Sequence, residues 1–198
     1  MSISIHQRSY DCEAFAEDDG RIRVRGRLVD NKPQGLGLAD GEPLIIHEMV
    51  VQLYVTVPAF EIDAVDVDMV VHPYAVCTDV LPDYQQLVGL SITRGYSRRV
   101  KELFGGPNGC SHVGALLQAM GPVAIQSSWS LVNLHDDPAD RLVNDTNEPE
   151  RMRRLKLNTN TCHVWREDGD HMAAVARGDM TLRPGWEVER LRALGVDV

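Results

Sequence analysis

The sequence predicts an α+β fold: an N-terminal antiparallel β-sheet, two central helices, a C-terminal β-hairpin and a short terminal helix. Three observations support this class. Residues 21–71 contain alternating and β-branched apolar segments that are typical of strands. Apolar residues at helical spacing replace this alternation near Pro82. Strands and helices are grouped in separate parts of the chain, which favours α+β over a doubly wound sheet.

Three segments predict the strands of the sheet. Residues 21–30 alternate between arginine and apolar side chains, so one face of this strand is buried. Residues 44–57 are apolar and rich in β-branched side chains, and a proline ends this second strand. Residues 60–71 form the third strand, in which the apolar face changes near Ala64 and predicts a β-bulge. The residues before 21 are expected to be irregular.

The arginine face of the first strand has two interpretations. Guanidinium groups match carboxylates in geometry, so the face could bind an anionic ligand. The favoured interpretation is a solvated face that pairs with acidic side chains of a neighbouring strand. The acidic residues expected in this role are Glu61, Asp63, Asp66 and Asp68.

Helical periodicity predicts the two central helices. Apolar residues recur at intervals of three and four over residues 82–104, and Gly105-Gly106 is a strong stop signal. A second helix begins near Cys110 and extends to Leu131, and Pro122 is expected to kink or divide it.

The C-terminal part begins with an acidic, proline-bearing segment over residues 135–150, which predicts an exposed loop. Residues 160–166 and 171–180 flank Asp168-Gly169, and this arrangement predicts a hairpin. Residues 186–194 predict the short terminal helix.

Composition limits the possible partners. The chain has 198 residues, 43% of them hydrophobic, so we expect one domain that spans residues 1–198. A formal net charge of −9 argues against a nucleic-acid partner. No apolar stretch is long enough to span a bilayer, and no secretory signal is visible. We therefore expect a cytoplasmic protein with a small-molecule ligand and no membrane partner.

In a reducing compartment the four cysteines are expected to be free thiols, metal ligands or a nucleophile. The run GGPNGCSH, residues 105–112, places the thiol of Cys110 and the imidazole of His112 at a helix start. The helix dipole and the free N–H groups there stabilise a thiolate, so Cys110 is the candidate nucleophile. The alternative is a small buried thiol in a tight turn.

His112 is a candidate partner of Cys110, although residues two apart on a helix do not face each other. The pair therefore requires Cys110 to lie just before the first turn, or a histidine from elsewhere. His72 and His163 are the candidates for that second role, because each lies in the region of another cysteine.

A second candidate site is a metal centre. Cys77, Asp79, Cys110 and Cys162 offer thiolate and carboxylate ligands suited to zinc or iron, although their spacing is not that of a zinc finger. The alternative is a set of unrelated core thiols.

The same residues carry a resemblance to a known family. Three runs, HPYAVC at 72–77, LVGLSITRGYSRRV at 87–100 and GGPNGCSHVGALL at 105–117, resemble the bacterial domain-of-unknown-function family number 2889. Its most specific block is carried here by Gly109–His112. The resemblance covers most of the chain, implies no assigned activity, and supports treating Cys77, Cys110, His112 and Cys162 as one group.

A fainter similarity is to NifU-like iron–sulfur scaffold proteins. That similarity implies a metal held by Cys77 and Asp79, by Cys110 at a helix start, and by Cys162. The long β-rich N-terminal half of this chain has no counterpart in those scaffolds.

Three functions remain open. The favoured one is a small-molecule enzyme, acting on an organic acid or an acyl compound, with Cys110 and His112 in its site. The second is a metal- or sulfur-carrying accessory protein that uses three cysteines. The third is a non-catalytic interaction or structural domain.

Overall fold

The structure is a computed structural model, and its chain divides into two compact units, Met1–Leu134 and His135–Val198, which are described separately. The described residues are 2–36, 41–135, 155–156, 158–177, 179 and 184–195. The predicted acidic loop therefore lies largely outside the described residues.

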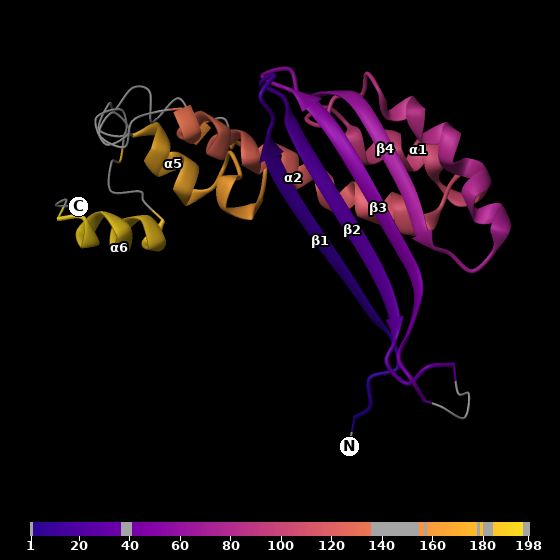
Figure 1. Ribbon diagram of the computed structural model, residues 1–198. Coiled ribbons are helices and arrows are strands. Elements are labelled where there is room, and N and C mark those ends of the chain that lie inside the picture. Colours follow the sequence, from indigo (N-terminus) through magenta and orange to yellow (C-terminus); the bar gives the residue numbers. More distant parts are fainter. Residues whose placement is uncertain are drawn as a thin grey trace. The chain divides into compact units, whose positions relative to one another are not determined.

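The first unit is built on a four-stranded antiparallel sheet with the strand order β1-β2-β3-β4 (Figure 1). The strands are β1 (Gln7–Ala16), β2 (Ile22–Lys32), β3 (Leu44–Thr56) and β4 (Glu61–Val71). Strands β2 to β4 confirm the three predicted ones. The register of β3 and β4 shifts between the pairs Tyr54↔Ala64 and Val55↔Ile62, which confirms the bulge predicted near Ala64.

Strand β1 was not predicted, and the expectation of an irregular N-terminus is wrong. This strand pairs with β2 along its whole length, from Gln7↔Asn31 to Ala16↔Ile22. Most of its side chains are exposed, because it lies at the edge of the sheet. The sequence carried a short signal for this strand, because Cys12 and Ala14 alternate with Asp11 and Glu13 and are partly buried against the core.

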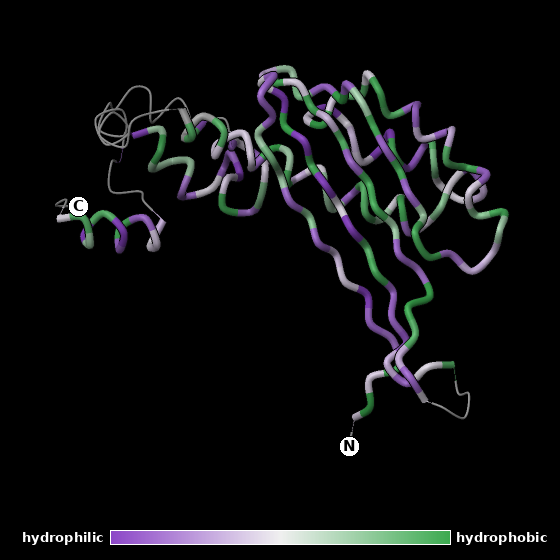
Figure 2. Tube along the Cα trace, in the orientation of Figure 1, coloured by the Kyte–Doolittle hydropathy of each residue, from purple (hydrophilic) through white to green (hydrophobic). Residues whose placement is uncertain are grey.

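The core lies between one face of the sheet and the helices. Alternation along β2, visible in Figure 2, points Ile22, Val24 and Leu28 into this core. Figure 1 shows α1 and α2 on the same side of the sheet. Leu116 and Met120 of α2 are fully buried within the same cluster, so α2 lies over the apolar face of the sheet.

The helix predicted over residues 82–104 is interrupted. A 3₁₀ segment, η1 (Ala75–Leu87), and the helix α1 (Tyr96–Phe104) replace it. Gly89 and Gly95 between them have φ angles of 85° and 67°, which are left-handed and break a right-handed helix. Apolar residues at this helical spacing still face the core: Leu87, Ile92 and Val100 are buried, and Leu103 is partly buried. Because each segment faces the same core, the apolar spacing persisted without a continuous helix.

After the short 3₁₀ turn η2 (Gly106–Asn108), helix α2 (Ser111–His135) begins where the sequence predicted. Of the two effects expected of Pro122, a kink or a division, the division does not occur, because α2 continues through the proline. None of the helices in the described ranges combines the length and the hydrophobicity that crossing a bilayer requires.

The second unit contains η3 (His163–Trp165), α5 (Asp170–Ala176) and α6 (Gly185–Ala193). Helix α6 confirms the predicted terminal helix. The predicted hairpin is wrong, because α5 occupies the place of its second strand. Gly169 is the N-cap of this helix and Asp170 lies in its first turn, where a carboxylate favours helix formation.

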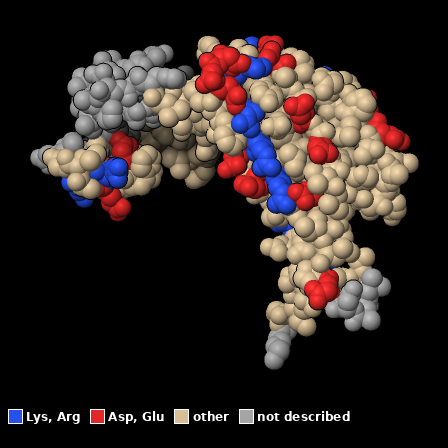
Figure 3. Space-filling view, viewed as in Figure 1, with Lys and Arg blue, Asp and Glu red and all other residues tan. Residues whose placement is uncertain are grey.

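The outer face of the sheet carries the arginines of β2 and the preceding Arg21, and a basic stripe runs along this face in Figure 3. These arginines pair with acidic side chains, as predicted, but most of the partners are not among the four acidic residues that were expected. Arg21 binds Asp63, one of the four expected partners, at 2.6 Å. The other ion pairs of the stripe join Arg21 to Asp19, Arg23 to Glu17 and Arg27 to Glu48, each at 2.7 Å.

Candidate functional site

The candidate site is centred on a buried carboxylate, Asp30, whose side chain is only 1% exposed. Asp30 lies on the helix-facing side of β2, and the sheet register sets it directly between Arg8 of β1 and His47 of β3. A buried charge is costly unless it is paired. Arg8 supplies the pairing with two hydrogen bonds, from Nε to Oδ1 at 2.6 Å and from Nη2 to Oδ2 at 2.7 Å.

This bidentate pair sets the charge of both partners. Hydrogen bonds from the Arg8 guanidinium hold the pKa of Asp30 well below its usual range, although burial opposes the shift. The same contacts raise the pKa of Arg8 above its already high value. Asp30 is therefore a permanent anion at neutral pH.

Three histidines surround this anion. His112 of α2 places Nε2 at 3.1 Å from Oδ2, and His47 places Nδ1 at 3.3 Å from the same oxygen. His6 lies 3.4 Å from Oδ1. The rings of His47 and His112 are stacked, with centroids 3.8 Å apart. Nδ1 of His47 is buried and makes no hydrogen bond of acceptable geometry, in spite of its distance to Asp30.

Cys110 lies immediately before the first turn of α2. Its carbonyl accepts the first hydrogen bond of the helix, from Gly114 N–H at 2.9 Å. Its own N–H donates to the hydroxyl of Tyr84 at 2.9 Å, and Tyr84 is fully buried. From this position Sγ lies 3.6 Å from Nδ1 of His112. A contact between residues two apart is possible here because Cys110 precedes the helix.

The state of His112 follows from its surroundings. Burial, together with the nearby His47 and Arg8, lowers the pKa of His112, and Asp30 only partly opposes this shift. His112 is therefore neutral at pH 7, and its contact with Asp30 is a hydrogen bond and not an ion pair. In the tautomer that fits this network, Nε2–H donates to Asp30 and the Nδ1 lone pair faces Cys110.

The thiol, the imidazole and the carboxylate thus form a chain from Cys110 through His112 to Asp30. Nucleophilic catalysis generally uses this arrangement: the nucleophile contacts a base, and a third group orients the base. The thiol is partly exposed, as a reactive cysteine must be. Burial raises the pKa of Tyr84 to about 12, so its hydroxyl stays neutral while it holds the Cys110 backbone.

Three other predicted site residues of the first unit, His72, Cys77 and Asp79, lie outside this chain of contacts. His72 contacts the carbonyl of Tyr74 through Nδ1 at 2.9 Å. Cys77 lies in η1, partly buried against the core, and Asp79 of the same segment is exposed. Cys162 and His163 belong to the second unit, whose placement relative to the sheet is not described.

A different set of potential metal ligands comes together. Among the described residues, Asp30, His47 and His112 form one group of His, Cys, Asp or Glu side chains that could hold a metal ion. Their donor atoms all lie within 4.8 Å of one another. This group contains none of the four residues predicted as metal ligands.

Sequence reasoning missed Arg8, Asp30 and His47. One signal was present in β2: Asp30 occupies an inward position of the alternating pattern, on the same face as Ile22 and Leu28. A carboxylate on an apolar face is rarely buried without a partner, so this position was informative. His47, within the apolar run of β3, carried a similar signal.

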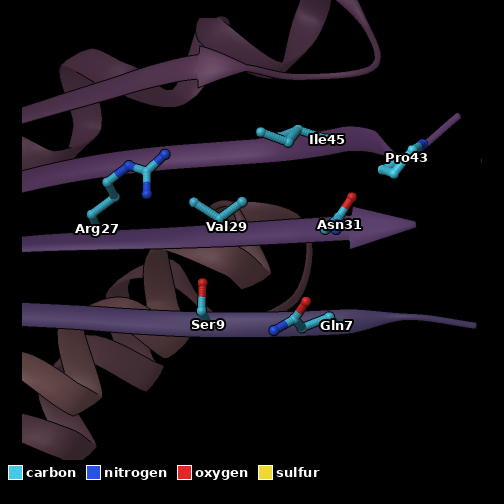
Figure 4. Close-up of a pocket in the computed structure, with 7 residues that line it drawn as sticks. All are labelled: Gln7, Ser9, Arg27, Val29, Asn31, Pro43 and Ile45. Carbon is cyan, nitrogen blue, oxygen red and sulfur yellow. The ribbon is translucent and has the colours of Figure 1, made fainter. Parts of the chain in front are cut away.

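A hollow of about 420 Å³ lies on the outer face of the sheet, away from this site (Figure 4). The close-up shows polar side chains of β1 and β2 along it, among them Gln7, Ser9 and Asn31. Successive residues of a strand point to opposite faces, so the hollow does not contain Asp30. None of the candidate catalytic residues lines it.

Comparisons with known proteins point to one family. Residues 6–126 match the family model described as protein of unknown function (DUF2889). The matched range includes β1 to β4 and the start of α2, and so all residues of the Cys110–His112–Asp30 chain. No curated protein and no solved structure matches the sequence.

Proposed function

The chain belongs to the DUF2889 family, whose description assigns no activity, and we propose that it is a thiol enzyme acting on the acyl group of a small organic acid. The observation that carries this proposal is the continuous contact from Cys110 Sγ to His112 Nδ1, at 3.6 Å, and from His112 Nε2 to Asp30 Oδ2, at 3.1 Å. Cys110 has a position before a helix, where the dipole stabilises a thiolate.

The reaction begins with a proton transfer. Neutral His112 accepts the thiol proton of Cys110 on Nδ1, and the thiolate attacks the carbonyl carbon of the acyl substrate. Asp30 stabilises the imidazolium that forms, and Arg8 keeps Asp30 ionised and oriented. The leaving group departs with the proton that His112 returns to it, and the acyl group remains on Cys110 as a thioester.

The second half of the reaction releases the acyl group. Water or another nucleophile loses a proton to His112 and attacks the thioester carbonyl, and the Cys110 sulfur leaves and recovers the proton. The negative charge on the carbonyl oxygen faces N–H groups of the first turn of α2, which have no partner within the helix. The N–H of Cys110 itself is bound to Tyr84 and does not contribute.

Two measurements test this proposal. In the first, the folded chain reacts with a limiting amount of iodoacetamide at pH 7, and peptide mass spectrometry compares its thiols. Cys162 is exposed and serves as the reference. Cys12 is a poor reference, because burial raises its pKa. Cys110 is expected to react fastest.

The second measurement follows hydrolysis of a series of p-nitrophenyl esters of increasing acyl length. We expect a burst of one nitrophenol per chain that Cys110→Ala abolishes and Cys12→Ala leaves intact. His112→Asn should slow turnover by about 10²–10⁴-fold, the usual contribution of a general base. If Cys110 reacts no faster than Cys162 and no ester gives a burst, the thiol-enzyme proposal is wrong.

A further inference from the structure

We propose that Asp30, His47 and His112 also bind a divalent transition-metal ion such as zinc, and that this ion suppresses the thiol chemistry of Cys110. The binding claim stands on geometry alone. The claim of suppression rests on the proposed function, in which Asp30 orients His112 through its Nε2. The ion would occupy this Nε2.

Two of the three donor separations match those of a tetrahedral metal site. Nitrogen and oxygen ligands lie about 2.0–2.1 Å from zinc, so two ligands of a tetrahedral site are about 3.4 Å apart. Asp30 Oδ2 lies 3.1 Å from His112 Nε2 and 3.3 Å from His47 Nδ1. All three donor atoms lie within 4.8 Å of one another, so one ion can reach them after side-chain adjustment.

His47 gives an independent indication. Its Nδ1 is buried and has no hydrogen-bond partner among the described residues. Buried polar atoms without a partner are uncommon, and an ion at this point would satisfy it. The thiol chemistry uses His112 and Asp30 but has no step for His47, so metal binding gives this side chain a role.

The surroundings suit a site for a divalent ion. Two imidazoles and one carboxylate form a ligand set used for zinc and ferrous iron, and three protein ligands leave a coordination position open. The ligands come from β2, β3 and α2, which hold them rigidly. Arg8 binds both oxygens of the same carboxylate, including the Oδ2 that faces the two histidines, and orients it, as outer partners of metal ligands do. Its positive charge lowers the affinity.

Metal binding and base catalysis exclude each other at His112. When Nε2 coordinates the ion, the ring proton of neutral His112 lies on Nδ1 and faces Cys110. Nδ1 then donates to the sulfur and can no longer accept the thiol proton. A bound ion therefore removes the general base.

The experiment uses the untagged, metal-free full chain. Calorimetric titration with zinc chloride measures binding, and cobalt(II) absorption reports the ligand geometry. We expect one zinc ion per chain, retained in Cys110→Ser and weakened at least about 100-fold in His47→Asn. His171→Asn, in α5, is the matched control and should bind as the parent does. Circular dichroism checks that each variant is folded.

Labelling of Cys110 by iodoacetamide links the two activities. Zinc should slow this labelling in the parent chain and leave it unchanged in His47→Asn. If zinc does not bind, or binds His47→Asn equally well, while Cys110 remains the fastest thiol, the metal site is wrong and the proposed function stands. If binding depends on His47 but Cys110 reacts no faster than Cys162, the site stands and the proposed function and the suppression fail.

Discussion

Gly26 of β2 tests the packing that positions His112 over Asp30. It lies on the helix-facing side of the sheet, beneath α2, in the same strand as Asp30. A Cβ atom added there would lie 2.6 Å from Met120 Sδ, 2.9 Å from Met120 Cγ and 3.0 Å from Leu116 Cδ1. Both of these side chains are fully buried, so they have little room to move away.

The expected cost of Gly26→Ala follows from two opposing effects. Overpacking a dense core costs about 1–3 kcal/mol. The backbone of Gly26 is not left-handed, and replacing glycine by alanine inside a strand recovers about 0.5–1 kcal/mol of backbone entropy. At the middle of both ranges, the net loss in the free energy of unfolding is about 1 kcal/mol. For a urea slope of about 2 kcal/mol/M, the midpoint falls by about 0.5 M.

Urea unfolding followed by far-UV circular dichroism measures this change. Gly114→Ala is the matched control, because a Cβ at Gly114 of α2 meets no atom within 4 Å. Alanine favours a helix interior by about 0.8–1 kcal/mol over glycine, so this variant should gain stability. If Gly26→Ala is as stable as the parent while Gly114→Ala gains, Met120 does not lie over Gly26 and the described seating of α2 is wrong.

Three further outcomes are expected. Because the pKa of His112 is lowered, ester turnover, which needs the neutral imidazole, should reach half its maximum below pH 6.5. Arg8→Gln should move this midpoint to higher pH, and an unchanged midpoint would mean that Arg8 does not influence the ring. Arg8→Gln should also destabilise the fold by about 2 kcal/mol at pH 7, less than for a fully buried pair because Arg8 is 34% exposed. The depressed pKa of Asp30 gives stability that is present above pH 4 and lost on acidification. The melting temperatures of the parent chain and Arg8→Gln should therefore converge toward low pH. Tyr84→Phe leaves the Cys110 N–H without its acceptor and should cost about 1–2 kcal/mol in urea unfolding; no loss would show that this bond contributes nothing.

Local patterns were sufficient for much of the fold. The alternation in β2, the bulge near Ala64 and the start of α2 at Ser111 were readable because each depends on which face of one segment is buried. Edge strand β1 carried a weaker pattern, because only Cys12 and Ala14 among its side chains are partly buried against the core. The helix predicted across Gly89 failed for the opposite reason, since tertiary packing produced helical spacing without a helix.

The sequence by itself determined that a thiol and an imidazole meet a helix start at Cys110 and His112. Only the tertiary structure decided what lies opposite them. The register of the sheet brings Arg8, Asp30 and His47 side by side, and the packing of α2 over that face sets His112 against Asp30. Register and helix packing are set by contacts between residues far apart in the chain, which no local periodicity encodes.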